Sequence, residues 1–453
     1  MTEIHNAFLL RQATTRGVAL VALLSCLPVW SLDLSQAYET ALEQDASIRS
    51  TRAATDARRE RIPQARAQLL PNLSANVTHN TNQLESTSPN FLGTPVTSNS
   101  TYGSGNTSIT LRQPIFRKYQ FADYQQAQAQ VDDANAVLER ETRNLAVRVS
   151  GAYFEALQAG EQLTLVLAQK KTYTAQLEAA KRRYAAGAGT RTDGDEAQAA
   201  LDLNYAQELE ARQNVDFTRR QLQALVNGPL GNLALLDANK LVLARPEPEQ
   251  VEAWVERAEA SSPEVQSLTA QLEAARQEVE KAKAGHYPTL DAVAQWSRSE
   301  SENVTSVNTS YTNRTVGFQL NVPIYAGGYV NSIVRQAVAD QERATQALEA
   351  LRRDLGVRVH HEFRGVTEGV LKVRAMEQAV RSTEQVAISN RRSFEAGSRT
   401  LIDTLNAEQQ QTAARRDLSQ ARLIYLASRI RLEALTGGAT TEVIKEINGW
   451  LQH

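Results

Sequence analysis

The chain has 453 residues, and its 49 Lys and Arg against 51 Asp and Glu leave a formal net charge of −2. This near balance, without basic runs, argues against a nucleic-acid-binding surface and against a polybasic membrane anchor. Its hydrophobic share of 42% is modest for a large globular core, and much of it is alanine, which suits thin seams between helices.

Residues 1–31 have the pattern of a secretory signal. Two arginines precede the apolar run 17–27, and Val29 and Ser31 occupy the −3 and −1 positions of a cleavage site before Leu32. The apolar run is too short to cross a bilayer as a helix, and no stretch of 18 apolar residues follows it. The sequence therefore predicts an exported chain without a transmembrane helix, located in the periplasm, outside the cell or in an outer membrane.

The only cysteine, Cys26, lies within this segment. Cleavage after Ser31 removes it and leaves a mature chain without thiol chemistry. A competing interpretation treats Leu24-Ser25-Cys26 as a lipoprotein cleavage site, with Cys26 lipidated, and the sequence leaves both open.

Proline positions divide the rest of the chain. All twelve prolines lie outside residues 115–228 and 324–453. Since proline breaks helix interiors, these two segments can each form very long helices.

The sequence also repeats itself. Matched pairs lie 217 residues apart at first and 210 apart later, so one half carries an insertion. The pairs include Pro71/Pro288, Gly187/Gly397 and Asp193/Asp403. We place the insertion in the Ser/Thr/Asn-rich stretches 80–106 and 300–313, because surface loops tolerate changes in length.

Each half is expected to run helix, strand, polar loop, strand, long helix, turn, return helix. The predicted parts are a signal peptide, a first repeat, a middle segment, a second repeat and a tail, at 1–31, 32–230, 231–262, 263–438 and 439–453. In the first repeat we expect strands near 72–82 and 104–115, and helices near 117–186 and 192–227. In the second we expect strands near 289–299 and 312–323, and helices near 328–396 and 401–436.

The strands are predicted from residues of alternating polarity, most clearly in the second half. One face there carries Leu290, Ala292, Ala294 and Trp296, then Val316, Phe318, Leu320 and Val322. Aromatic residues flank the strands: Phe116, Tyr119, Tyr287, Tyr325 and Tyr329 toward the helices, Tyr102 and Tyr311 toward the loops. Such girdles mark bilayer interfaces, although an ordinary four-stranded sheet can also have aromatic edges.

Four such strands are too few to close a transmembrane barrel. Lipid does not tolerate unpaired strand edges, and small membrane barrels need at least about eight strands. Several chains would therefore have to contribute strands to one barrel.

The first long helix has an apolar residue at every seventh position, typical of a coiled-coil seam. These positions are Tyr124, Val131, Leu138, Leu145, Ala152, Ala159, Val166, Tyr173 and Ala180. About 65 helical residues span roughly 100 Å. In the second half the pattern is looser, and we expect Gln341, Glu362 and Asn390 to face water or another surface.

Each long helix is expected to turn back on itself. Gly187 and Gly397 end the long helices, and Thr/Asp pairs then begin the return helices. Two αα-hairpins follow from this arrangement.

Together with the duplication, four motifs resemble the TolC-like outer-membrane efflux proteins from Leu34 to about Gly438. They are Leu70-Pro71-Asn72-Leu73, Tyr287-Pro288-Thr289-Leu290, Val322-Pro323-Ile324-Tyr325-Ala326-Gly327-Gly328 and Ala396-Gly397-Ser398-Arg399-Thr400-Leu401-Ile402-Asp403. The resemblance implies an α+β membrane protein: a homotrimer whose 12-stranded β-barrel, four strands per chain, continues into a long α-helical coiled-coil barrel in the periplasm. Residues 231–262 and 439–453 would form an equatorial belt around it.

The resemblance also implies a function. The channel would be the exit duct of a tripartite efflux pump or a type I secretion system, exporting small molecules or proteins across the outer membrane. Its partners would be a periplasmic adaptor (membrane fusion) protein and an inner-membrane transporter. No enzymatic activity, cofactor or metal is implied.

The resemblance assigns two gate positions near the second hairpin tip, Asp403 and Asn406. Three Asp403 carboxylates around a threefold axis would attract cations and raise one another's pKa. Asn406 stands where the best-known pattern has a second acid, which weakens the expected cation selectivity. As an alternative or additional role, Asp403 caps the start of a helix.

Further residues are assigned to a latch and to the tips. Arg399 would tie its hairpin to Thr192 and Asp193, and Phe394 replaces a tyrosine, which removes one hydrogen-bond donor. A solvated Arg399 is the simpler alternative. Gly187 and Gly397 would contact the adaptor, although both also serve as ordinary helix-ending glycines.

Two other functions compete with the channel. A periplasmic coiled-coil adaptor or tether without a pore would explain the hairpins but not the amphipathic strands; a helical filament is a second rival. His360 and His361 point about 100° apart on a helix and are not expected to share a metal. Gly327-Gly328 lacks phosphate-loop context and is predicted to be a strand-to-helix turn.

Overall fold

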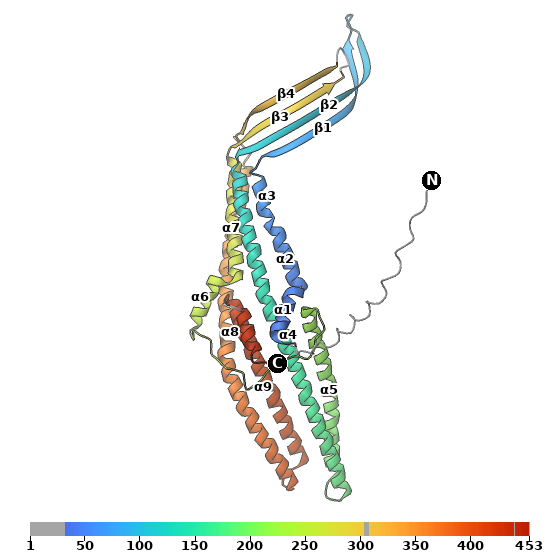
Figure 1. The fold of residues 1–453 in the computed structure, drawn as a ribbon, viewed down its shortest axis with the longest axis vertical. Helices are drawn as coiled ribbons and strands as arrows, with labels where there is room; N and C mark the ends of the chain where they lie inside the picture. The colour runs from blue at the N-terminus through green and yellow to red at the C-terminus, as the bar shows by residue number, and fades with distance from the viewer. Residues whose placement is uncertain (1–31, 303–307, 439, 453) are drawn as a thin grey trace, which may run out of the picture.

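The computed structural model describes residues 32–302, 308–438 and 440–452. The predicted signal peptide, with Cys26, lies outside this part of the chain. The molecule is elongated, with a curved four-stranded sheet at one end and two long helical hairpins at the other (Figure 1).

The two halves follow one another along the chain. The first comprises α1 (Leu34–Gln44), α2 (Ala46–Arg59), α3 (Arg61–Ala67), β1 (Asn72–Pro89), β2 (Pro95–Phe116), α4 (Lys118–Ala185) and α5 (Arg191–Val226). The second comprises α6 (Val251–Ser261), α7 (Pro263–Lys283), η1 (Ala284–His286), β3 (Thr289–Ser301), β4 (Thr309–Asn321), α8 (Tyr329–Glu395) and α9 (Leu401–Leu435), and α10 (Thr440–Asn448) follows.

The first pair of strands is longer than the sequence suggested. We expected a polar loop over residues 80–106, but β1 and β2 stay paired until Pro89 meets Pro95. The Ser, Thr and Asn side chains there do not oppose pairing, because backbone hydrogen bonds hold the ladder and threonine favours strands. The turn is confined to residues 90–94, where Gly93 supplies a φ of +80°.

The helix expected before the first strand is broken into three. Asp45 ends α1 and caps α2, accepting a 2.9 Å hydrogen bond from the Ile48 backbone N–H. Asp45 is also 3.4 Å from Arg148 of α4. The break lets this lead-in segment bend along α4.

The seam of α4 matches its seven-residue repeat, since none of the nine apolar positions is exposed. In α8 one of the positions expected to face water or another surface packs against a neighbouring helix. Glu362 does not face water but is buried, with its carboxylate 3.0 Å from Arg431 of α9. Pairing with a cation is what allows a carboxylate at a buried position.

The core lies at the middle of the molecule, where segments from both halves and the C-terminus meet. Tyr153 of α4 and Tyr425 of α9 are fully buried. Their hydroxyl groups donate 3.0 Å hydrogen bonds to the carbonyl oxygens of Ala234 and Ala244. These bonds attach the irregular segment 227–250 to both hairpins.

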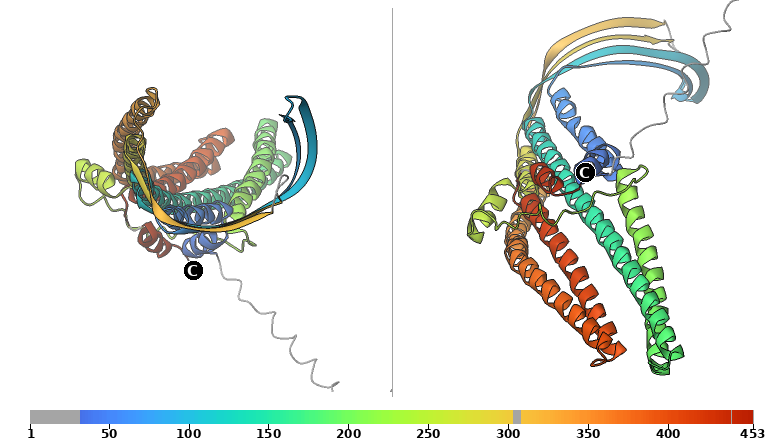
Figure 2. Two further views of the ribbon diagram at one scale, coloured as in Figure 1. Left: turned by 90° about the horizontal axis from the view of Figure 1, so that it is seen from above. Right: turned by 60° about the horizontal axis from the view of Figure 1, so that its bottom comes forward.

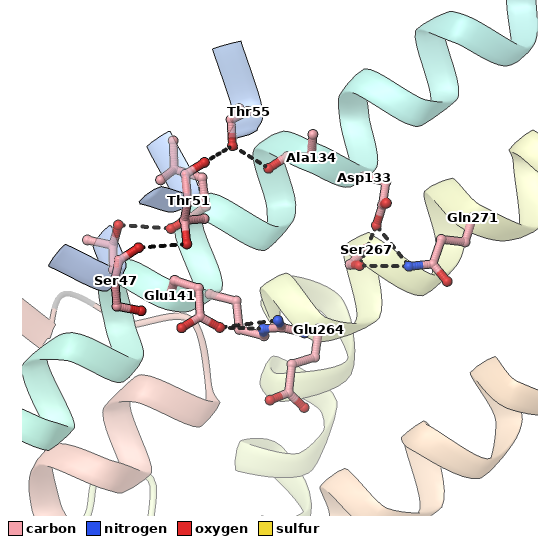
Figure 3. Close-up of polar contacts among 12 residues, drawn as sticks. Ser47, Thr51, Thr55, Asp133, Ala134, Glu141, Glu264, Ser267 and Gln271 are labelled. Carbon is pink, nitrogen blue, oxygen red and sulfur yellow. Dashed lines mark hydrogen bonds and ion pairs between the residues drawn. The ribbon is translucent and has the colours of Figure 1, made fainter. Parts of the chain in front are cut away.

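Polar contacts also join α4 to α2 and to α7 (Figure 3). Asp133 of α4 accepts hydrogen bonds from Ser267, at 2.6 Å, and Gln271, at 3.0 Å, both on α7. The Thr55 hydroxyl of α2 lies 3.3 Å from the Ala134 carbonyl oxygen. Buried polar groups with partners specify which helix faces meet.

Among the described ranges, no helix combines the length and the apolar character needed to cross a membrane.

Candidate functional site

The sheet has one apolar and one polar face. Its order is β1-β2-β3-β4, and a single row of paired residues crosses it from Leu73 through Leu111 and Ala294 to Val316. Leu73 and Val316 are 69% and 87% exposed. Exposed apolar residues in such a row need a partner surface or lipid.

The next row of the ladder is polar throughout. It runs from Ser74 through Thr110 and Gln295 to Thr315. Strand side chains alternate between faces, so these four residues lie on the face opposite to Leu73. The predicted alternation is thus present in both halves, including the first, where the sequence signal was weak.

The predicted aromatic residues lie near the two ends of the shorter strand pair, β3 and β4, and Tyr102 lies close to that level inside the longer β2. At the helix end Tyr325 and Tyr329 are largely exposed, and Lys118 lies over the Tyr287 ring, 5.6 Å from its centre. At the other end Tyr311 is exposed and Tyr102 half-buried. Aromatic rings exposed at both ends of an apolar face fit an interfacial girdle.

A buried ion pair joins the sheet to the first long helix. Asp291 of β3 is 4% exposed and accepts two hydrogen bonds from Arg117, the residue before α4. The bond donated by Nε of Arg117 is 2.8 Å long. Such a bidentate contact fixes the orientation of the start of α4 relative to β3.

Both hairpin tips are built in the same way. Gly187 and Gly397 have φ angles of +72° and +79°, and open space surrounds them. Thr190 and Thr400 then cap the return helices, each exchanging hydrogen bonds with the aspartate three residues later. The sequence signals for these turns therefore describe real caps.

The two positions predicted to form a gate lie directly after the second tip. Asp403 accepts hydrogen bonds from the Thr400 hydroxyl, at 2.8 Å, and from the Thr400 N–H, at 3.1 Å. These bonds, with a smaller contribution from Arg399, lower the pKa of Asp403 below its ordinary value. In the single chain Asp403 thus acts as a capping residue, while Asn406, one turn on, is exposed.

The predicted contacts of Arg399 differ in the single chain. Arg399 lies in the turn just before α9, and its guanidinium is 3.9 Å from Asp403 in the first turn of that helix, rather than beside Thr192 or Asp193. Asp193 instead bonds to Thr190 in the first cap. The cause is local: Asp403 lies four positions after Arg399, within the first turn of α9, and this short separation keeps the two side chains close.

Asp193 and Phe394 do come together, in a cavity of about 430 Å³ between the two hairpins. The Arg183 guanidinium, from α4, lies over the Phe394 ring, 4.6 Å from its centre. This cation–π contact needs no hydroxyl group on the ring. It was missed because the sequence does not show which helix faces meet.

Glu408 of α9 is a second residue that the sequence alone did not single out. It is buried and accepts hydrogen bonds from Gln176 of α4, at 2.8 Å, and from Arg391 of α8. Helical spacing places Glu408 on the same buried stripe as Leu401 and Leu405, and an acid on such a stripe is the signal that could have revealed it.

The other candidate residues have structural roles. Gly327 and Gly328 have φ angles of +60° and +81° and form the turn before α8. The ring of His361 is 3.3 Å from Glu362. In the part of the chain that the structure describes, no group of three or more His, Cys, Asp or Glu residues is placed to hold a metal ion.

A family model described as outer membrane efflux protein matches residues 37–228 and 254–438. The chain is 32% identical to the alkaline protease secretion protein AprF of Pseudomonas aeruginosa, over 90% of this chain and 85% of AprF. It is 30% identical to the proteases secretion protein PrtF of Dickeya chrysanthemi, over 93% and 92%. It is 28% identical to the outer membrane protein TolC of Escherichia coli, over 92% and 85%.

Solved structures show the same fold at lower identity. The CmeC outer membrane channel of Campylobacter jejuni superposes with a TM-score of 0.76 at 15% identity, over 92% of this chain and 90% of CmeC. The open state of the MtrE outer membrane channel of Neisseria gonorrhoeae gives 0.71 at 19%, over 90% and 89%.

Proposed function

This chain belongs to the outer membrane efflux protein family, and from that premise we propose that it releases proteins as the exit duct of a type I secretion system. It is an outer-membrane channel whose helical tunnel projects into the periplasm, and it is not an enzyme. One observation carries the proposal: AprF and PrtF, each named for protease secretion, match about 90% of the chain at 30% identity or more.

The proposed channel is a homotrimer with a 12-stranded barrel. β1 and β4 are the two edges of the sheet, and an edge strand exposes a row of unpaired backbone groups. Lipid does not satisfy those groups, so β1 of one copy would pair with β4 of the next. Three copies would close the ring head to tail.

The helical layer supports the same closure. On α5, Tyr205, Leu209 and Phe217 are half or more exposed and recur at helical spacing. On α8, at the opposite flank (Figure 1), Val357 and Leu371 are similarly exposed and lie two heptads apart. These two stripes, which we call the α5 flank and the α8 flank, would meet between neighbouring copies.

The proposed partners are a periplasmic adaptor protein and an inner-membrane transporter. The turns between α4 and α5 and between α8 and α9 form the end of the molecule farthest from the sheet (Figure 1), and Gly187 and Gly397 lie in these turns. Because a Cβ at either glycine would meet open space, the tips can approach another protein closely. We assign the adaptor contact to these tips.

The tips would also form the gate, with Asp403 and Asn406 lining the entrance. The latch assigned to Arg399, Asp193, Thr192 and Phe394 would form between copies or during closure. Arg399→Ser, alone or with Asp193→Ala, is then expected to raise single-channel conductance in planar bilayers. Unchanged conductance in both variants would remove the latch.

Secretion is tested in the organism that encodes the chain. Deleting its gene should abolish release of the protein substrate into the medium, and restoring the gene should recover it, while susceptibility to small toxic compounds stays unchanged. Undiminished secretion together with increased susceptibility would overturn the proposal in favour of small-molecule efflux.

The trimer is tested on an outer-membrane fraction run unboiled on a denaturing gel. A trimer band that heat converts to monomer is expected. A monomer that leaves the membrane without detergent would instead support the adaptor or tether.

A further inference from the structure

A groove of about 800 Å³ runs between α5 and α9, with α4 as its floor. Carboxamide side chains supply much of its polar lining. Among them are Gln162 of α4, Asn204, Gln207 and Asn214 of α5, and Asn406 and Gln409 of α9. Nothing in the gate or latch uses this arrangement, apart from Asn406.

Asn204 is the unusual member of this set. It is 1% exposed, yet neither its Oδ1 nor its Nδ2 has a hydrogen-bond partner among the described residues. The Oε1 atom of Gln162 is likewise buried and unpartnered. Buried polar groups in native proteins are rarely left unsatisfied, so these atoms point to a partner that the single chain does not supply.

The groove has the dimensions of a short stretch of extended chain. On α5 its lining runs from Glu196 to Asn214, which corresponds to about 27 Å of helix. An extended polypeptide covers that distance with about eight residues. On α9 the lining from Ile402 to Arg416 faces it at matching helical spacing.

The two helices that form the walls of the groove lie toward the concave side of the curved sheet. Seen from above, α5 and α9 lie on that side, with α4 behind them (Figure 2). Asn406, the second gate position, belongs to the same lining. In the proposed trimer the groove would therefore open into the tunnel, starting at its periplasmic entrance.

A carboxamide offers an acceptor oxygen and two donor hydrogens, and a peptide group offers one acceptor and one donor. A row of carboxamides can therefore bond to backbone of any sequence, without selecting side chains. We propose that the groove binds the extended backbone of a polypeptide passing through the tunnel. This inference rests on the proposed role in protein secretion.

The competing explanation is local. Asn204 lies on the buried stripe of α5, between Leu201 and Glu208, where a polar residue can fix the register of a coiled coil. In that case Asn204 needs no ligand, and replacing it with the similarly sized leucine should only make the chain more heat-stable.

The test uses single channels of the full chain in planar bilayers. The probe is an uncharged, end-blocked peptide of about ten alternating Gly and Ser residues, chosen to exceed the groove. A polyethylene glycol of equal length lacks amide groups and is the control probe. Block durations are compared for wild type, Asn204→Leu and Gln207→Leu/Gln409→Leu, with the exposed neighbour Gln410→Leu as matched control.

Peptide blocks are expected to last longer than polymer blocks and to shorten about three- to tenfold in the lining variants, as for the loss of one or two hydrogen bonds. Gln410→Leu should behave as wild type. If Asn204→Leu impairs trimer assembly, the exposed Gln207 and Gln409 still provide the test. Equal block durations in wild type and the lining variants would overturn the inference.

The two proposals fail separately. Peptide block needs no adaptor, transporter or natural substrate, so it reports on the groove alone. A wild-type gene that does not restore secretion overturns the proposed function, and unchanged block durations alongside restored secretion overturn only the groove.

Discussion

The two long helices follow one plan but are used differently. α4 and α8 have 68 and 67 residues, yet 21 residues of α4 are buried and only 9 of α8. Both helices bury the seven-residue seam in the central core: Leu145 and its counterpart Leu355 are both inaccessible. The difference lies on the other face of each helix.

That second face is covered in α4 and open in α8. Phe154 is 4% exposed, while its counterpart Arg364 is exposed. Val147 packs against the core, while its counterpart Val357 is 69% exposed. Duplication therefore preserved the hairpin, and divergence made one helix the centre of the chain and the other its flank.

The largest expected effect is a loss of stability when the buried second face of α4 is disrupted. Phe154→Ala removes a buried ring that packs edge-on against Tyr153, with ring centres 6.4 Å apart, and should cost about 3–5 kcal/mol. Arg364→Ala should stay within about 0.5 kcal/mol. Denaturant unfolding of the solubilised chain measures both. Similar losses at the two positions would show that the second faces are equivalent.

In the sheet, by contrast, the halves should respond alike. Ile109 and Phe318 each lie five residues before a proline, Pro114 and Pro323 respectively, and both are on the exposed apolar face. Arginine at either position should cost about 2–4 kcal/mol, because it would face hydrocarbon. Gln319→Arg, on the polar face, is the control. Refolding into lipid vesicles measures these energies, and equal costs for Phe318→Arg and Gln319→Arg would contradict the assignment of faces.

A smaller effect is expected at the α8 flank. Val357→Asp would place a carboxylate between neighbouring copies and should lower the ratio of trimer to monomer about tenfold, which corresponds to about 1.4 kcal/mol. Val357→Thr keeps the volume and should change the ratio much less. Light scattering in detergent gives this ratio. A fully trimeric Val357→Asp would show that the flank stays in solvent.

The smallest expected effect is the pH dependence of the second tip. The pKa of Asp403 is lower in the folded chain than its unfolded value of about 3.9. Its ionised carboxylate therefore stabilises the helix cap fully above about pH 3.9. This stabilisation is lost as the pH falls through the lower folded pKa. Cation preference should accordingly persist down to about pH 4.

Reversal potentials across a salt gradient measure this preference, with Asp403→Asn as the variant that lacks the charge. Loss of preference well above pH 4 would show that the three carboxylates raise one another's pKa more than the cap lowers it. Asn406→Asp should strengthen the preference at neutral pH.

The repeated plan was readable from sequence because it is local. Glycine with positive φ at Gly187 and Gly397, threonine caps and seven-residue spacing each act within one or two turns of helix. The length of the first strand pair was not readable, because the Ser/Thr/Asn-rich stretch forms a strand only through pairing with its partner. The surroundings of Arg399 in the single chain were not readable either, because the acid that it approaches, Asp403, lies only four positions further along the same tip.

The sequence by itself determined the order of helices and strands, the two hairpins and the alternating faces of the sheet, because backbone propensity and periodic burial are written along the chain. Only the tertiary structure decided which face of α4 is covered, that Arg183 meets Phe394, and that carboxamides from three helices line one groove. Those features depend on contacts between residues far apart in sequence, and packing geometry alone selects them.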